Sequence, residues 1–481
     1  MSESYEQAHC RSVRESGAGC SVLLRKDGSF PLKEAGSIAL FGSGARHTVR
    51  GGTGSGEVNA RSSVNIEEGL KAAGFSITST AWLDAYDRIR AGAEKAFIKG
   101  IKAEARAQMK PSIMLAFGRS PAEPEYDIPL TGEGAAALYV LSRISGEGAD
   151  RNAVKGDIFL TDSEKRDILE LNGKYPAFML VLNTGGPVDL SPVKDVKNIL
   201  VLSQLGTETG HILADIILGK SSPSGRLTTT WSAWEDYPLK EEFGDINETL
   251  YKEGIYVGYR YFGTVGKKPL FPFGFGLSYT EFSREAKLFE LEGDKVRVSA
   301  EVTNKGSYSG REVLQLYVSK PEGRLDQPAL ELCAFSKTPD LKPGSSGALE
   351  LSCSMRDLAS YDEEREQYIL EQGDYLFFLG TSSEDNKHIG TVRITEEIVT
   401  RTAKNLTGSA AFEDFKPEHR IRPEADISGK APVFTLDPAA VPAEEPHYDA
   451  VRDTDPLVKK LSDDELILMN IGAFRTGGRL I

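Results

Sequence analysis

Apolar and polar positions divide the chain into a part that alternates strands with helices and a part made of strands. Before residue 281, short apolar runs at 137–144 and 177–182 flank a helical pattern at 163–172. Short buried strands separated by helices are typical of a mostly parallel sheet that is covered on both faces. We therefore predict the fold class α/β, with an α/β (αβα) sandwich domain over residues 1–280.

The spacing of apolar positions changes to every second residue in the next part of the chain. Within 295–304, apolar and polar residues alternate, which is the pattern of a half-buried strand. Further strands are expected at 313–318, 348–353 and 375–379. Because Gly and Pro turns separate these strands, residues 281–402 are predicted to form an all-β sandwich domain.

The last part of the chain reads as a linker followed by a helix. Residues 403–456 are rich in Pro, Glu and Ala, which predicts an extended linker. Ser462 is a favourable N-cap, and Glu465 follows it at the third helical position. A helix that begins so late has no core left to pack on, so residues 457–481 are expected to begin a further domain.

One turn in the α/β part presents an acidic side chain between two glycines. The apolar run 135–141 predicts a buried strand, and the polar turn 142–151, which contains Glu147, follows it directly. Ligands of open α/β sheets bind beyond the carboxyl ends of the strands. A carboxyl on such a turn can reach a bound molecule. The alternative is that Glu147 only caps a helix or pairs with Arg151.

Two other segments suit either binding or packing. The glycine-rich loop 50–59 lacks the Gly-Lys-Ser/Thr ending of a phosphate-binding loop, so it suits close approach to a sugar or to a neighbouring domain. The segments 253–262 and 269–279 are dense in aromatic residues. These residues form either a wall on which sugars stack or the packing between two domains.

Composition narrows the range of partners. The formal net charge of -14 argues against nucleic acid and anionic membranes, which require basic surfaces. Four Cys without CxxC spacing and six His without a cluster predict neither a metal site nor a cofactor. The N-terminal residues lack the apolar region of a secretory signal, and no apolar run approaches a membrane span, so a cytoplasmic protein is expected.

Several motifs occur in a fixed order along almost the whole chain: Gly51–Gly56, Ser142–Arg151, Ser222–Leu227, Tyr256–Phe262, Phe273–Tyr279 and Glu312–Val318. Together they resemble glycoside hydrolase family 3, the β-glucosidase family. The resemblance implies an α/β sandwich and a fibronectin type III-like domain at 281–402. It also implies a (β/α)8-type barrel that follows them, of which this chain holds only the beginning.

The resemblance also implies roles for individual residues. Glu147 would be the general acid/base of a retaining mechanism, and Ser55 and Arg151 would contact the substrate. The family nucleophile is an Asp in a Ser/Thr-Asp-Trp stretch of the barrel, whereas no Trp of this chain follows an Asp. Because this sequence lacks that stretch, the nucleophilic carboxyl of the retaining mechanism must be supplied from elsewhere.

Retaining hydrolysis needs two carboxyls roughly 5 Å apart. We therefore expect β-linked glucosides or oligosaccharides as substrates, with little hydrolysis unless the barrel is supplied in cis or in trans. The rival hypothesis is a non-catalytic carbohydrate-binding or scaffold protein of the same fold, and a gene truncation is a third. A homo-oligomer is compatible with each of them.

Overall fold

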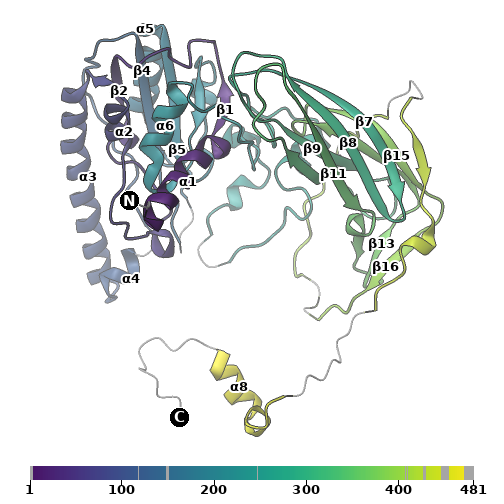
Figure 1. Ribbon diagram of the computed structural model, residues 1–481. Coiled ribbons are helices and arrows are strands. Elements are labelled where there is room, and N and C mark those ends of the chain that lie inside the picture. Colours follow the sequence, from purple (N-terminus) through teal and green to yellow (C-terminus); the bar gives the residue numbers. More distant parts are fainter. Residues whose placement is uncertain are drawn as a thin grey trace.

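An α/β domain and an all-β domain make up most of the chain (Figure 1). The computed structural model describes residues 4–116, 119–147, 151–245, 248–406, 408, 410–425, 430–445 and 454–470. Each domain has its own hydrophobic core of buried residues. The predicted fold classes of both parts are therefore confirmed.

A six-stranded sheet forms the centre of the α/β domain, in the order β1-β6-β5-β4-β2-β3. Neighbouring strands run parallel except β1, which is antiparallel to β6. Every residue of β4 and β5 is buried, because helices and loops cover both faces of the sheet. The strands are β1 (Val22–Arg25), β2 (Ser37–Phe41), β3 (Ser76–Ile77), β4 (Ala136–Arg143), β5 (Ala177–Thr184) and β6 (Ile199–Val201).

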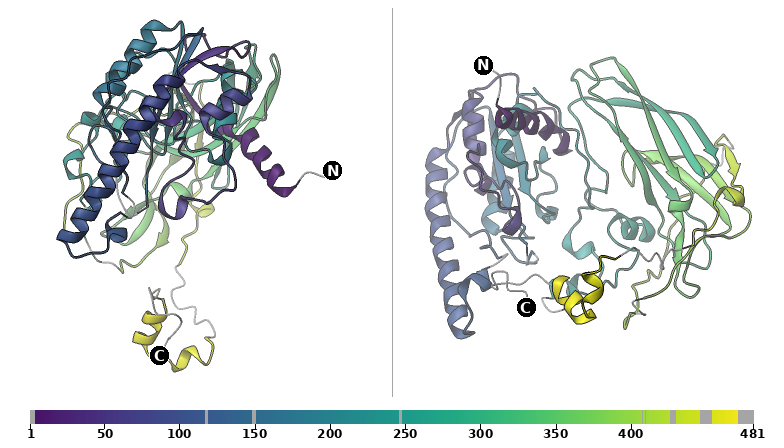
Figure 2. Two further views of the ribbon diagram at one scale, coloured as in Figure 1. Left: turned by 90° about the vertical axis from the view of Figure 1, so that its left-hand side faces the viewer. Right: turned by 60° about the horizontal axis from the view of Figure 1, so that its bottom comes forward.

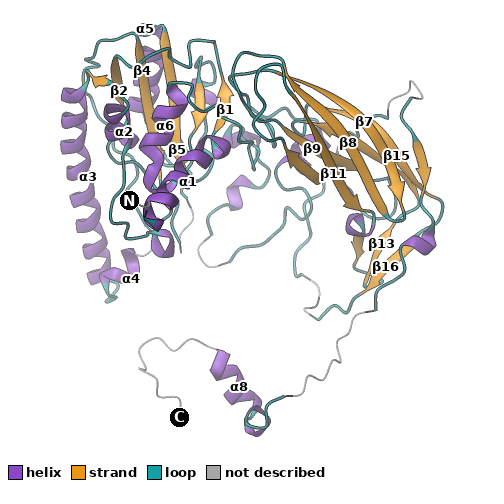
Figure 3. Cartoon of the chain, in the orientation of Figure 1, coloured by secondary structure: helices purple, strands orange, loops and turns teal. Residues whose placement is uncertain are grey.

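Helices α1 (Tyr5–Cys20), α2 (Ile66–Ala72) and α6 (Thr209–Ile217) pack on one another beside the sheet (Figure 3). α5 (Asp162–Lys174) contacts β5, and its N-terminus carries a capping box formed by Thr161 and Glu164. Within the described ranges, no helix is both long and apolar enough to cross a membrane.

The sequence reasoning missed α3 (Thr80–Ala107), a helix of 28 residues that is followed by the short α4 (Ser112–Ala116). α3 runs along the side of the molecule that faces away from the sandwich (Figure 2). Its first turns bury Trp82 and Tyr86, whose rings stack on each other 5.4 Å apart. Most of its later residues are exposed, so the apolar period that marks a buried helix is weak there.

The sandwich contains a five-stranded sheet, β10-β9-β14-β15-β17, and two three-stranded sheets, β11-β8-β7 and β12-β13-β16. β8 buries alternate residues as its pattern predicted. The strands are β7 (Phe282–Glu292), β8 (Lys295–Asn304), β9 (Val313–Ser319), β10 (Glu331–Lys337), β11 (Ser346–Ser354), β12 (Ser360–Asp362), β13 (Gln367–Leu370), β14 (Gly373–Gly380), β15 (Asn386–Ile394), β16 (Ile398–Thr402) and β17 (Val433–Thr435).

Part of the segment predicted as a linker belongs to the sandwich. β17 pairs in parallel with β15, and Leu436 and Val441 are buried in the sandwich core. Further on, α8 (Asp463–Asn470) begins directly after Ser462, as predicted, and the Glu465 amide donates to the Ser462 hydroxyl. Residues 471–481, the end of the predicted barrel start, lie outside the described residues.

Polar and aromatic contacts join the two domains. Arg226 of the α/β domain and Arg284 of β7 both pair with the buried Glu312 carboxylate. Tyr259, the first residue of α7 (Tyr259–Val265), stacks on Phe273 and meets Tyr317 of β9 edge-on. These rings support the interpretation that the aromatic segments pack where the domains meet.

Strand order places a topological switch point at the carboxyl ends of β2 and β4. The chain passes from β2 to β3 on one side of β2, and β4 then lies on the other side of β2. The connections from β2 to β3 and from β4 to β5 therefore lead to opposite sides, and open α/β sheets bind ligands at such a topological switch point. The glycine loop follows β2, and the turn with Glu147 follows β4.

Candidate active site

The glycine loop and the Glu147 turn are joined by backbone hydrogen bonds. The Thr53 amide donates to the Ser145 carbonyl oxygen at 3.1 Å, and the Glu147 amide donates to the Thr53 carbonyl oxygen at 3.4 Å. This short parallel bridge fixes the backbone of the turn beside the switch point. The side chain of Glu147 is exposed, so its carboxyl is accessible to a molecule bound there.

Glycine is required where the two loops touch. Gly54 has a φ of +75°, and a Cβ at this position would lie 2.8 Å from both the Cβ and a carboxylate oxygen of Glu147. A Cβ on Gly52 would lie 2.9 Å from the Ser145 carbonyl oxygen. The glycines therefore let the loop support the Glu147 turn directly. The side chain of Ser55 lies outside the described part of the structure.

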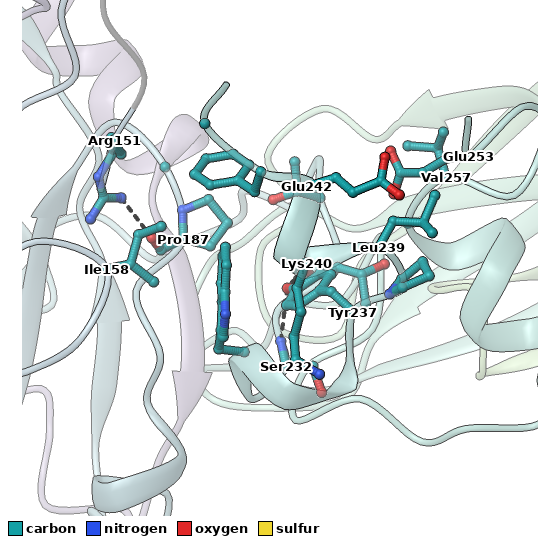
Figure 4. Close-up of a pocket in the computed structure, with 18 of the residues that line it drawn as sticks. Arg151, Ile158, Pro187, Ser232, Tyr237, Leu239, Lys240, Glu242, Glu253 and Val257 are labelled. Atoms are coloured by element: carbon teal, nitrogen blue, oxygen red, sulfur yellow. Dashed lines mark hydrogen bonds between the residues drawn. The ribbon is translucent and has the colours of Figure 1, made fainter. Parts of the chain in front are cut away.

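Arg151 is engaged by protein acceptors. Its Nε donates to Asp157 Oδ1 at 2.7 Å, Nη2 to the Asp157 carbonyl oxygen at 2.8 Å, and Nη1 to the Pro187 carbonyl oxygen at 2.6 Å. Figure 4 shows the contact with Pro187. Arg151 follows the Glu147 turn on the side away from β4, and its contacts connect this end of the turn to Asp157 and Pro187.

A buried ion pair anchors the end of β4. Arg143 donates to both carboxylate oxygens of Glu164, at 2.9 and 2.7 Å, and its Nε donates to the Asp157 carbonyl oxygen at 2.9 Å. Glu164 also accepts the Thr161 amide in the capping box of α5. One carboxylate therefore serves as the helix cap and as the partner of the arginine that precedes the turn.

Another carboxyl, Glu123, lies next to this ion pair. Tyr86 donates its hydroxyl to Glu123 Oε1 at 2.5 Å, and the Glu123 amide donates to the Gly156 carbonyl oxygen at 2.9 Å. Burial, together with the negative charge of Glu164, raises the pKa of Glu123 to about 7. Glu123 therefore titrates near neutral pH, and it lies next to the ion pair that anchors the end of β4.

Sequence reasoning missed Asn183, a residue of β5 that binds the backbone just before the glycine loop. Its side chain accepts the Val49 amide at 2.7 Å and donates to the carbonyl oxygens of Val49 and Ser203. Asn183 is fully buried near the carboxyl end of β5. Its signal in the sequence was a polar residue directly after the apolar run 177–182, at the edge of the sheet where ligands bind.

A groove of about 1320 Å³ opens beside the Glu147 turn. Ser145, Gly146 and Arg151 line one part of the groove, and residues from 228–245 and 248–260 line another. Figure 4 shows Arg151 on one side of the groove and Tyr237 and Val257 on the other. Six aromatic residues line it: Trp234, Tyr237, Phe243, Tyr251, Tyr259 and Phe273. A carboxyl next to such a groove could exchange a proton with a bound molecule. No cluster of metal-binding side chains occurs within the described ranges.

Comparison with known families assigns both domains. Residues 21–279 match the Glycosyl hydrolase family 3 C-terminal domain, and residues 312–383 match the Fibronectin type III-like domain. The chain belongs to glycoside hydrolase family 3. The family resemblance that the motifs indicated is therefore confirmed, and the switch point at β2 and β4 lies within the matched family domain.

Curated relatives of this family 3 chain are β-glucosidases. Beta-glucosidase A of Butyrivibrio fibrisolvens is 33% identical over 452 residues, which cover 83% of this chain and 53% of the relative. Thermostable beta-glucosidase B of Acetivibrio thermocellus is 30% identical over 420 residues, 85% of this chain and 51% of the relative. The chain thus spans about half the length of the curated relatives that it matches.

Solved structures of the family share the fold. Beta-glucosidase 3B from Thermotoga neapolitana in complex with glucose has a TM-score of 0.69 at 33% identity, covering 82% of this chain and 55% of that structure. A beta-glucosidase from Paenibacillus barengoltzii has a TM-score of 0.70 at 30% identity, covering 83% of this chain and 45% of that structure. The match extends across both domains of this chain.

Proposed function

We propose that this chain provides the general acid/base, Glu147, for the retaining hydrolysis of β-glucosides. The observation that carries the proposal is the placement of an exposed carboxyl at the switch point of the sheet, on a turn bridged to the glycine loop. The similarity to β-glucosidases supports the substrate class. Ser55, in the same glycine loop, is proposed to contact the sugar.

The chemistry divides between two carboxyls. Glu147 protonates the glycosidic oxygen as the leaving group departs, and then accepts a proton from the water that hydrolyses the glycosyl-enzyme intermediate. A second carboxylate must attack the anomeric carbon from the other face. Asp189, an acidic residue of the groove, accepts hydrogen bonds from the Ser191 and Trp234 amides through its two oxygens, which supports a structural role for it.

We therefore propose that the nucleophile comes from a barrel domain and that this chain by itself hydrolyses little. General acid catalysis alone contributes on the order of 10²–10⁴-fold, far below the acceleration by a complete glycosidase. The Ser/Thr-Asp-Trp stretch that would carry the nucleophile does not occur in this sequence, which supports the proposal.

The test measures hydrolysis of aryl β-glucosides by the purified chain, alone and mixed with a barrel domain from a relative. We expect turnover only in the mixture, and Glu147→Gln should lower it by about 10²–10⁴-fold. The loss should be larger for leaving groups of higher pKa, because these depend most on protonation. Glu350→Gln, which changes an exposed acidic residue of β11 in the sandwich, is the matched control and should leave turnover unchanged.

Two results would contradict the proposal in different ways. Rapid turnover by the chain alone, lost in Glu147→Gln, would show that both carboxyls are present in this chain. Turnover by the mixture that is unchanged in Glu147→Gln would assign the proton transfer to another group.

The aromatic lining of the groove favours a second candidate, a carbohydrate-binding protein without catalysis. Aromatic faces stack on sugars, and Trp234 lines the groove next to Tyr237. This alternative predicts firm binding of cellobiose by the chain alone, measured by calorimetry, and its loss in Trp234→Ala. Absence of binding without a barrel would exclude it.

A further inference from the structure

The two arginines that flank the Glu147 turn donate to the same residue. Arg143 precedes the turn and Arg151 follows it, and both reach the Asp157 carbonyl oxygen, at 2.9 and 2.8 Å. Arg151 also pairs with the Asp157 carboxylate at 2.7 Å. Arg143 and Arg151, at the two ends of the segment that contains Glu147, thus bind the same carbonyl oxygen.

Burial and charge make these ties stronger than a surface ion pair. The side chains of Arg151 and Asp157 are 13% and 16% exposed. Asp157 Oδ2 also accepts the Asn152 amide at 2.6 Å, so both carboxylate oxygens are used. Charge-assisted hydrogen bonds in a partly dry setting are roughly twice as strong as neutral ones, and surface screening affects them less.

The geometry requires arginine at position 151. Its three nitrogens reach one carboxylate and two carbonyl oxygens in different directions, including the Pro187 carbonyl beyond β5. A planar fork with fixed donor directions can make these contacts together, whereas the single ammonium of lysine cannot. A sugar hydroxyl would therefore meet a guanidinium that is already held by the protein.

We propose that Arg151 and Asp157 are positioning residues that hold the Glu147 turn in place, and that Arg151 does not act by binding the sugar. The proposal rests on the acid/base function proposed for Glu147. Proton transfer needs a carboxyl placed within a fraction of an ångström, and a turn tied at one end only would sample other positions. Arg143 holds the β4 end of the turn, and the Arg151–Asp157 pair holds the other end.

Amide hydrogen exchange of the purified chain tests the proposal without any turnover. We expect Arg151→Lys to speed exchange at the Glu147 and Thr53 amides by about tenfold, because both amides depend on the position of the turn. Exchange in the sandwich should stay unchanged. Asp157→Asn should give the same local effect, and it provides a second variant if the first does not fold.

The control is another arginine–aspartate pair of the same chain. Arg393 makes a two-pronged contact with Asp374 on the sandwich, at 2.7 and 2.9 Å. Arg393→Lys should leave exchange at Glu147 and Thr53 unchanged. If Arg151→Lys and Asp157→Asn leave these two amides as slow as in the unmodified chain, or speed exchange equally everywhere, the positioning proposal is wrong.

Kinetics in the mixture with a barrel domain separate positioning from sugar binding. A positioning residue predicts that Arg151→Lys lowers kcat by at least tenfold with KM changed less than twofold, whereas a sugar-binding residue predicts a raised KM. If Glu147→Gln leaves turnover unchanged, the proposed acid/base function fails. The exchange experiment still decides whether Arg151 holds the turn.

Discussion

Glu123 has a pKa near neutral pH and lies close to the ion pair that anchors the end of β4. Its amide donates to the Gly156 carbonyl oxygen next to Asp157, and its carboxyl accepts the Tyr86 hydroxyl. Burial is the main reason that its pKa rises to about 7, and the charge of Glu164 adds to it. At the scale of single residues, the protonation of this carboxyl therefore affects the stability of the fold.

The stability of the chain should depend on pH through Glu123. The pKa of Glu123 is about 7 in the folded chain against an ordinary value of 4.5, so the folded state holds the proton more tightly. The contribution of this group to stability is complete below about pH 4.5 and is lost as the pH rises to about 7. Glu123→Gln should thus stabilise the chain at pH 8, by up to about 3 kcal/mol, and change little at pH 4.5.

Denaturant unfolding across this pH range measures the difference between the two proteins. Glu125→Gln is the control, for which we expect the opposite effect on the free energy of unfolding. Burial alone would raise the pKa of Glu125, but hydrogen bonds from Ser163 and from the Asp162 amide lower it. Removing that carboxylate should therefore destabilise the chain at neutral pH. A pH-independent difference for Glu123→Gln would contradict the assignment.

At the scale of elements, the site depends on loops that follow parallel strands. β2 leads into the glycine loop, β4 into the Glu147 turn, and β5 supplies Asn183, which binds the backbone at Val49. Every residue of β4 and β5 is buried, so these strands have contacts on both faces of the sheet. The loops take their positions from contacts with each other, so a small change in one of them should move the other.

Gly54→Ala tests this dependence. The new Cβ would lie 2.8 Å from Glu147, and the φ of +75° is unfavourable for alanine, so the turn should shift at a cost of about 1–2 kcal/mol. We expect a loss of turnover in the mixture with a barrel domain of at least tenfold, beyond what the reduced stability explains. Gly56→Ala in the same loop meets nothing within 4 Å and should leave turnover unchanged.

Glu312 links the α/β domain to the sandwich through a buried ion pair. This carboxylate is 1% exposed and pairs with Arg226 from the other domain and with Arg284 from its own. Gln315 adds a second tie by donating to the Gly274 carbonyl oxygen at 3.0 Å. The groove walls include Tyr259 and Phe273, which pack at this interface, so its loss should also loosen the groove.

Glu312→Ala leaves two arginines without their partner and should destabilise the chain by about 3–5 kcal/mol. Scanning calorimetry should then show the two domains unfolding in separate transitions, because each has its own core. Asp374→Ala, which removes an exposed partner of Arg393, should cost no more than about 1 kcal/mol. A single unshifted transition for Glu312→Ala would contradict the importance of this contact.

Sequence reasoning succeeded where a signal is local. The buried strands β4 and β5 are continuous apolar runs, β8 alternates, and Ser462 with Glu465 begins α8. It missed features that lack an apolar period or that depend on contacts between distant residues. α3 is mostly exposed, β17 is a strand only because β15 offers an open edge, and Asp157 is notable only because two arginines converge on it.

The two fold classes, the family and the carboxyl on a glycine turn could be predicted from the amino-acid sequence, because they depend on periodicity and on short contiguous motifs. Only the tertiary structure decided what surrounds that carboxyl. The switch point between β2 and β4, the glycine loop against Glu147 and the contacts of Arg151 with Asp157 and Pro187 join residues far apart in the chain. Their geometry follows from strand order, which no local pattern encodes.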